Sequence, residues 1–199
     1  MRIPYKLSKV YDYFILINLP SFIDHEIVKV KRDFGRVNGR YLSLVSKPHI
    51  SMFNFPQPKE REPEILSALS DLLLKQPVFR VDLSGYNFFH ENNTFYISIS
   101  NQVSLKELYR KVILQLHLLL IPRGFLRSNF TPHITIGRKL SNKQFQNALA
   151  EYNHKPFEES FELSYVTVLR REYPWSSWQL IRELPLKQKE NGLFTAQRS

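Results

Sequence analysis

The chain has 199 residues, of which 43% are hydrophobic and 23% charged, a composition typical of a globular domain. It contains no cysteine, which excludes disulfide bonds, thiolate nucleophiles and cysteine-based metal sites. The formal net charge of +10 fits attraction to a polyanion such as RNA or to a phosphorylated metabolite, and it fits an ordinary basic surface equally well.

Secondary-structure signals alternate along the chain between short apolar runs typical of strands and the 3.6-residue apolar spacing of helices. Pro63 suits a first helical turn, and Ser104–Glu107 and Ser141–Gln144 have the spacing of capping boxes. In chain order the predicted elements are strand 11–19, a helix capped by Ser21, strand 49–55, a helix from Pro63, strand 78–89, strand 94–100, a helix capped by Ser104, strand 133–138, a helix capped by Ser141, strand 161–172 and strand 178–184.

The remaining segments are predicted as turns and a tail. "HENN" at 90–93 and "YPWSS" at 173–177 are expected to be hairpin turns. The chain after Leu186 is polar, so we predict one domain over 1–186 and a disordered tail over 187–199. The apolar stripe expected on the first helix consists of Ile23, Ile27, Val30 and Phe34.

No segment has the pattern of a leader peptide or a membrane span. The apolar run 14–19 is short and is interrupted by Asn18, and no small-residue cleavage site follows it. The run 112–122 contains Gln115 and His117 and is too short to cross a bilayer. We therefore expect a soluble monomer without a membrane partner, and the absence of cysteine fits a reducing, cytoplasmic location.

The order of elements repeats once along the chain. Each half runs strand, capped helix, strand beginning at a histidine, and helix. His49 follows Ser21 by 28 residues, and His133 follows Ser104 by 29. Such a degenerate internal repeat predicts two similar lobes related by a pseudo-two-fold axis, with equivalent elements facing one another across a shared groove.

The two histidines of the repeat lie in matching motifs. "SKPHISMFNF" (46–55) and "FTPHITIGR" (130–138) share the pattern Pro-His-Ile followed by a hydroxyl residue. Because alternate residues of a strand point to one face, His49 shares a face with Ser51, and His133 with Thr135. The intervening positions, which are expected to face a core, are Ile50, Met52, Ile134 and Ile136.

Two imidazoles and two hydroxyls in one groove suit phosphoryl transfer without a metal. A neutral histidine accepts a proton from the attacking oxygen, and a protonated one donates to the leaving oxygen. The hydroxyls donate to the non-bridging phosphate oxygens. A single His-x-Thr on a strand is most often structural, but two copies at matched places of a repeat favour function. The sequence contains no His-Glu-x-x-His motif and no close histidine cluster, so we expect no metal cofactor.

The paired motifs resemble those of the two-histidine (2H) phosphoesterase superfamily, in the branch similar to bacterial 2′-5′ RNA ligases and cyclic phosphodiesterases. The resemblance covers about residues 11–186 in motif order and spacing, and "FTPHITIGR" carries it most strongly. It implies an α+β, bilobal fold with an antiparallel-rich sheet in each lobe and a central groove, and it implies activity without a metal. "MFNF" after the first motif departs from the branch's usual pattern.

The resemblance also implies substrates and roles. The substrate would be RNA or a nucleotide with a 2′,3′-cyclic phosphate end, or a related 2′-5′ linkage. His49 would be the proton donor and His133 the acceptor, with Ser51 and Thr135 as phosphate ligands. Three hypotheses stay open: a cyclic phosphodiesterase, a 2′-5′ ligase or 2′-5′ phosphodiesterase on oligonucleotides, and a non-catalytic RNA-binding module.

Further groove contacts are less clearly indicated by the sequence. Arg138 and Lys139 follow the second motif, but strict alternation places Arg138 on the face opposite His133 unless Gly137 bends the strand. Aromatic residues at the groove mouth are candidates for stacking on a base, although a core or surface position is the commoner outcome for each. They are Tyr41, Phe55, Phe125, Phe130, Tyr173 and Trp175.

Overall fold

The computed structural model describes residues 8–127, 129–172 and 176–188. Within these residues the chain forms four α-helices and eight strands, which confirms the predicted α+β class. The helices are α1 (Ser21–Asn38), α2 (Glu62–Leu73), α3 (Gln102–Leu118) and α4 (Asn142–Tyr152). The strands are β1 (Val10–Asn18), β2 (His49–Pro58), β3 (Phe79–Phe89), β4 (Thr94–Ile99), β5 (His133–Gly137), β6 (Glu158–Leu163), β7 (Tyr165–Glu172) and β8 (Gln179–Pro185).

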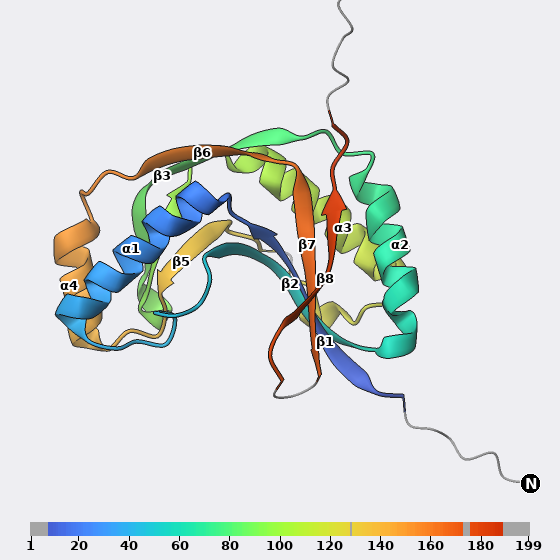
Figure 1. Cartoon of the computed structure of the whole chain (residues 1–199), viewed down its shortest axis with the longest axis horizontal. Coiled ribbons are helices and arrows are strands. Elements are labelled where there is room, and N and C mark those ends of the chain that lie inside the picture. Colours follow the sequence, from blue (N-terminus) through green and yellow to red (C-terminus); the bar gives the residue numbers. More distant parts are fainter. Residues whose placement is uncertain (1–7, 128, 173–175, 189–199) are drawn as a thin grey trace, which may run out of the picture.

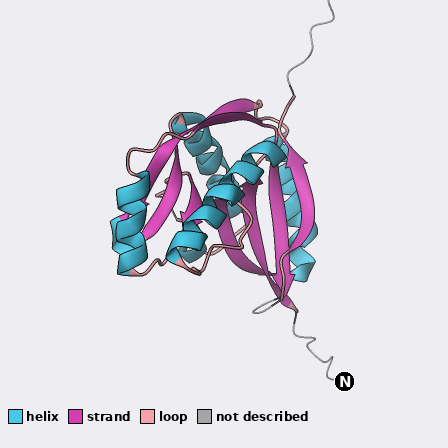
Figure 2. Ribbon diagram, turned by 60° about the vertical axis from the view of Figure 1, so that its left-hand side comes forward, coloured by secondary structure: helices cyan, strands magenta, loops and turns pink. Residues whose placement is uncertain are grey.

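The eight strands form a single sheet in the order β6-β3-β4-β5-β2-β1-β7-β8. Every pairing between these strands is antiparallel. The two histidine strands lie side by side at its centre, where Ile50 of β2 pairs with Ile134 of β5. The sheet is strongly twisted (Figure 2). Its strand β6 at one end runs across the direction of β7 and β8 at the other (Figure 1).

The sheet order is the same on both sides of the β2–β5 pair. Outward from β5 come β4, β3 and β6, and outward from β2 come β1, β7 and β8. The repeated order of elements therefore corresponds to two halves of one continuous sheet, in place of the two sheets that the sequence predicted. A division of the molecule into two lobes stays a prediction.

The helices pack on the sheet in two groups (Figure 1). α1 and α4 contact each other and pack on β5 and β4, while α2 contacts α3 and β8. Phe34 of α1 packs edge-on against Phe95 of β4, with ring centroids 5.7 Å apart. Ile50, Ile134 and Ile136 are fully buried, as their alternation with the histidines predicted. No helix among the described residues is long and apolar enough to span a membrane.

Several local predictions are confirmed. Ser141 caps α4 through a complete capping box, because its hydroxyl accepts from the Gln144 backbone N–H and its own N–H donates to the Gln144 side chain. Pro63 lies in the first turn of α2. Residues 90–93 connect β3 to β4, with Asn93 in the left-handed conformation that asparagine tolerates.

Two helix starts and one strand were predicted wrongly. α1 is capped by Pro20, whose carbonyl accepts from the Asp24 N–H, so Ser21 is its first helical residue. α3 begins two residues before Ser104, because the Asn101 side chain bonds to the β3 backbone and the helix starts directly after it. The predicted strand 161–172 is two strands divided at Ser164, and they lie in opposite halves of the sheet.

The predicted end of the domain lies next to the described core. Leu186 is buried, and Lys187 forms a β-bridge with Pro77. Lys187 therefore forms backbone contacts with the folded domain, although the sequence prediction placed it in the polar tail. Residues 189–199 of that tail, and residues 173–175 of the second predicted turn, lie outside the described residues.

Candidate functional site

A cavity of about 770 Å³ opens at the centre of the sheet. Its lining includes three of the four predicted site residues, Ser51, His133 and Thr135. His49 is not among the lining residues, but its ring packs edge-on against Phe14, which lines the cavity. The structure thus brings the two motifs, 84 positions apart in the sequence, to one place.

The strand register sets how the four residues face each other. Continuing the Ile50–Ile134 pairing by one residue to each side puts His49 opposite Thr135 and Ser51 opposite His133. All four then point to one face, because the flanking isoleucines point to the other. The histidines lie on the diagonal of this square, where neighbouring residues are about 7–8 Å apart and their Cβ atoms somewhat closer. Each imidazole therefore has the hydroxyl of the other motif directly across from it.

Both imidazoles are held in the same tautomer. Nδ1 of His49 lies 2.8 Å from the Lys47 carbonyl oxygen, and Nδ1 of His133 lies 2.8 Å from the Thr131 carbonyl oxygen. A carbonyl can only accept, so each Nδ1 carries the hydrogen and each Nε2 is left to take up or release a proton. The proline before each histidine explains the motif, because it confines the preceding residue to extended conformations and so directs its carbonyl.

An aromatic ring fixes each imidazole from the side. Phe14 meets the ring of His49 at 86°, with centroids 5.4 Å apart, and Phe89 meets the ring of His133 at 86° and 5.1 Å. Tyr96 also contacts His133 and stacks on Phe89. These supports could not be predicted from the sequence, because nothing local marks a strand residue as the neighbour of a histidine on another strand.

Burial lowers the pKa of both imidazoles below the usual value for histidine. In each case burial is the largest cause, and the hydrogen bond to the backbone carbonyl opposes it. The positive charges of Lys31 and Arg138 lower the pKa of His49 further, as does His133. Both histidines are therefore mainly neutral in the free protein at neutral pH, and a protonated His49 is a stronger acid than an isolated imidazolium.

Lys31 is a buried cation behind His49. Its side chain, 1% exposed, donates to the carbonyl oxygen of Ser46 at 2.5 Å and to its hydroxyl at 3.1 Å. It thereby anchors the segment that supplies the Lys47 carbonyl to His49. Burial lowers the pKa of Lys31 to about 8, and the charge of Asp24 opposes this. Val30, predicted in the apolar stripe of α1, packs partly buried against the core, and Lys31 next to it is the more deeply buried residue.

We expect stability to rise with pH between about 8 and 10 because of Lys31. The unfolded chain holds the Lys31 proton to a higher pH than the folded chain does, so over this window the unfolded state binds more protons. The free energy of unfolding rises by at most about 1.4 kcal/mol per pH unit. Denaturant unfolding at pH 8 and pH 9.5 measures it, with Lys31→Met as the comparison. If the free energy of unfolding of Lys31→Met rises equally with pH, other titrating groups cause the rise.

Arg138 lies in the cavity lining, so strict alternation misplaces it. β5 ends at Gly137, and the Arg138 backbone N–H leaves the ladder to donate to the buried hydroxyl of Ser43. A Cβ at Gly137 would lie 3.0 Å from a Leu140 methyl group, so the close turn here favours glycine. Lys139, at φ 50°, continues the turn and is absent from the lining.

The candidate stacking residues divide into two groups. Phe125 and Phe130 line the cavity. Phe55 is fully buried, and Tyr41 packs on Phe34 and donates to the Lys31 carbonyl, so neither lies in the cavity lining. Tyr173 and Trp175 lie outside the described residues.

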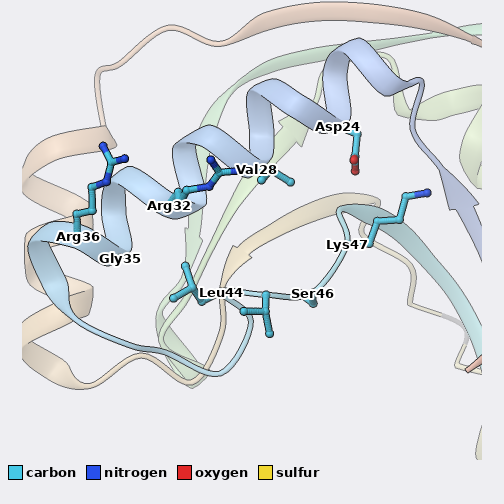
Figure 3. A pocket seen from close by; sticks show the side chains of 9 residues that line it. Asp24, Val28, Arg32, Gly35, Arg36, Leu44, Ser46 and Lys47 are labelled. Atoms are coloured by element: carbon cyan, nitrogen blue, oxygen red, sulfur yellow. The ribbon is translucent and has the colours of Figure 1, made fainter. Parts of the chain in front are cut away.

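A second cavity, of about 640 Å³, lies between α1 and the segment 44–47 (Figure 3). Asp24 and Arg32 border it from the helix and Lys47 from the segment, but neither motif histidine does. It is therefore separate from the paired motifs. Among the described residues no group of three or more His, Asp or Glu side chains is placed to hold a metal ion.

Comparisons with known proteins agree with this fold. The family model described as "2'-5' RNA ligase superfamily" matches residues 20–174. Apo LigT of E. coli has a TM-score of 0.68 at 19% identity, over 91% of this chain and all of LigT. TT0787 of Thermus thermophilus has a TM-score of 0.70 at 18% identity, over 89% of this chain and 99% of that one.

A eukaryotic structure shares the fold more distantly. Usb1 of Kluyveromyces marxianus has a TM-score of 0.54 at 14% identity, over 90% of this chain and 99% of that one. No curated protein sequence is matched. The family model spans most of the chain and includes both histidine motifs, so this chain belongs to the 2′-5′ RNA ligase superfamily of two-histidine phosphoesterases.

Proposed function

We propose that the protein is a metal-independent phosphodiesterase that hydrolyses 2′,3′-cyclic phosphate ends of RNA or nucleotides. The observation that carries the proposal is the matched tautomer of His49 and His133, which leaves two Nε2 atoms free on adjacent strands. His133 lines the cavity, and His49 packs against its lining residue Phe14. One such atom is a base when neutral and the other an acid when protonated. The proposed reaction uses both, because one proton leaves the attacking oxygen and another is added to the leaving oxygen.

In the proposed reaction a water molecule attacks the phosphorus of the cyclic ester. Nε2 of His133 accepts a proton from the water as its oxygen forms the new P–O bond. The bond from phosphorus to the 2′ or 3′ oxygen breaks, and Nε2 of His49 donates its proton to that oxygen. Ser51 and Thr135 donate hydrogen bonds to the non-bridging oxygens. The product is a phosphomonoester, and a proton exchange with solvent restores the two histidines.

Nucleotide complexes of a similar protein support the choice of substrate class. LigT of E. coli has been crystallised with 3'-AMP, with ATP and with phosphate, and these structures align with this chain at TM-scores of 0.65 to 0.67. The net charge of +10 also favours an anionic substrate. We therefore propose RNA ends or nucleotides over uncharged esters.

The family description favours a second reaction at the same residues. In 2′-5′ ligation the 5′ hydroxyl of another RNA end replaces water as the nucleophile, and the acid–base roles are unchanged. Cleavage of a 2′-5′ linkage is the reverse of this reaction. A non-catalytic RNA-binding module is the weaker alternative, because binding alone gives no reason to orient two imidazoles in one tautomer.

A nucleoside 2′,3′-cyclic phosphate incubated with excess chelator tests the proposal. We expect turnover to a phosphomonoester at the rate measured without chelator, because the two histidines supply the proton transfers themselves. The same assay with two oligonucleotide ends measures ligation. Loss of turnover in chelator that one divalent ion restores would contradict metal independence. A folded protein that binds the nucleotide without turning it over would favour the binding module.

A further inference from the structure

We propose that Lys106 and Arg110 of α3 form a second anion subsite, which binds the phosphodiester on the 5′ side of the terminal nucleotide. The protein then prefers oligonucleotide ends to mononucleotides. This inference rests on the proposed function and specifies its substrate class. It starts from a smaller cavity, of about 410 Å³, beside the histidine cavity.

The two cavities are continuous along one wall. Tyr109, Asn129, Phe130 and Thr131 line both of them. Thr131 also supplies the carbonyl that orients His133. A ligand that fills the site at His133 and extends past Phe130 therefore enters the smaller cavity directly.

A stack of three aromatic rings supports this shared wall. Tyr109 lies between Phe53 and Phe130, with centroids 4.3 Å and 4.1 Å away and interplanar angles of 16° and 5°. The Tyr109 hydroxyl donates to the carbonyl oxygen of Arg127 at 2.6 Å. Because α3 supplies the middle ring, the stack fixes this part of the helix relative to the histidine strands, and the cations of α3 are placed with it.

The charges favour an anion in the smaller cavity. Lys106 and Arg110 are four residues apart on one helix face, where like charges repel. Neither forms an ion pair with any residue that the structure describes. Arg127 adds another exposed cation at the larger cavity, whereas Glu91 is an acidic residue in that cavity's lining. The part of a polyanionic ligand that extends beyond the histidines is therefore attracted toward α3.

The chemistry of the substrate fixes which phosphate arrives there. In a 2′,3′-cyclic phosphate both the 2′ and the 3′ oxygens are bonded to the reacting phosphorus. The RNA chain can continue only through the 5′ oxygen of that nucleotide, and this oxygen carries the next phosphodiester. In an oligonucleotide, the phosphate nearest to the reacting one is thus this phosphodiester, one nucleotide away from the histidines. A mononucleoside cyclic phosphate has no such second phosphate.

The test compares a nucleoside 2′,3′-cyclic phosphate with a trinucleotide that ends in one. The variant is Lys106→Gln/Arg110→Gln, and the control is Lys29→Gln/Lys143→Gln, which removes the same charge from exposed positions outside both cavities. We expect the variant to lower kcat/KM for the trinucleotide by about tenfold, as the exposed Arg110 and the half-buried Lys106 together allow. Its kcat/KM for the mononucleotide should stay within about twofold. For the trinucleotide, we also expect a weaker salt dependence in the variant. The slope of log kcat/KM against the logarithm of the salt concentration should become shallower by about 0.7 for each phosphate that Lys106 and Arg110 neutralise in the wild type.

Equal losses on the two substrates, or the same loss in the control, would overturn the subsite. So would a wild-type protein that treats both substrates alike. If neither substrate reacts, the proposed function fails, and equilibrium binding of a fluorescent trinucleotide ending in a 3′-phosphate decides the subsite separately. About tenfold weaker binding in the variant alone then supports it, and unchanged binding excludes it.

Discussion

Replacing either motif histidine with alanine is expected to lower kcat by about 10²–10⁴-fold, the usual cost of losing one general acid or base. His49→Ala and His133→Ala each remove one of the two free Nε2 atoms and leave the other in place. The double variant should be far less than additive, because the two groups act on one transition state. Steady-state kinetics on a nucleoside 2′,3′-cyclic phosphate measure all three variants.

The hydroxyl residues provide a graded comparison. Ser51→Ala and Thr135→Val each remove one donor among several near the phosphate, so their losses should be smaller than those of the histidine variants. Circular dichroism and thermal unfolding check that all variants fold, which we expect because both histidines are only partly buried and lie outside the hydrophobic core. Full activity in either histidine variant refutes the mechanism, and an unfolded variant identifies its histidine as structural.

The pH profile of kcat/KM is expected to be a bell with its maximum below pH 6.5. Productive free protein needs one imidazole protonated and the other neutral, and both have pKa values lowered from 6.5 by burial. Above the upper apparent pKa, kcat/KM should fall about tenfold per pH unit as the last imidazole proton is lost. The bound phosphate favours the imidazolium, so the kcat profile should lie at higher pH.

Lys31→Met separates the contribution of the buried cation to this profile. Removing the positive charge raises the pKa of His49, so one limb of the kcat/KM bell should move to higher pH. A profile that is unchanged in Lys31→Met shows that Lys31 acts only in holding the Ser46 segment. A wild-type maximum above pH 7 contradicts the lowered pKa values.

Sequence alone predicted the features that depend on short-range rules. The Pro-His-Ile-Ser/Thr pairs define which residues share a face, because a strand alternates with period two. The Ser141–Gln144 box forms within one helical turn and was predicted correctly. Ser104 and Glu107 have the same spacing, but Asn101 bonds to a strand distant in the sequence and sets the start of α3 earlier.

Two features that were not predicted, the break between β6 and β7 and the burial of Lys31, have a signal in the residue spacing. The buried apolar residues Phe161 and Leu163 alternate in one phase and Val166 and Val168 in the other, with the buried polar Thr167 between the valines. The phase of the apolar residues therefore changes at the break between β6 and β7. Lys31 lies four residues after Ile27 and three before Phe34, which is the spacing of a buried helix face. Propensity places lysine at the surface, but the Ser46 oxygens satisfy its ammonium in the interior.

The crossing of the chain between the two halves of the sheet affects the order of folding. β1 is paired on one side by β2 and on the other by β7, and the Asn18 side chain donates to Thr167, 149 residues further along the chain. During synthesis the edge of β1 that pairs with β7 therefore stays open until β7 has left the ribosome. Contacts of such long range are slow to form. Asn18 is the β1 residue that pairs with His49, so the surroundings of His49 are complete only after β7 has been added. A chain that stops before β7 carries both histidine motifs without this contact.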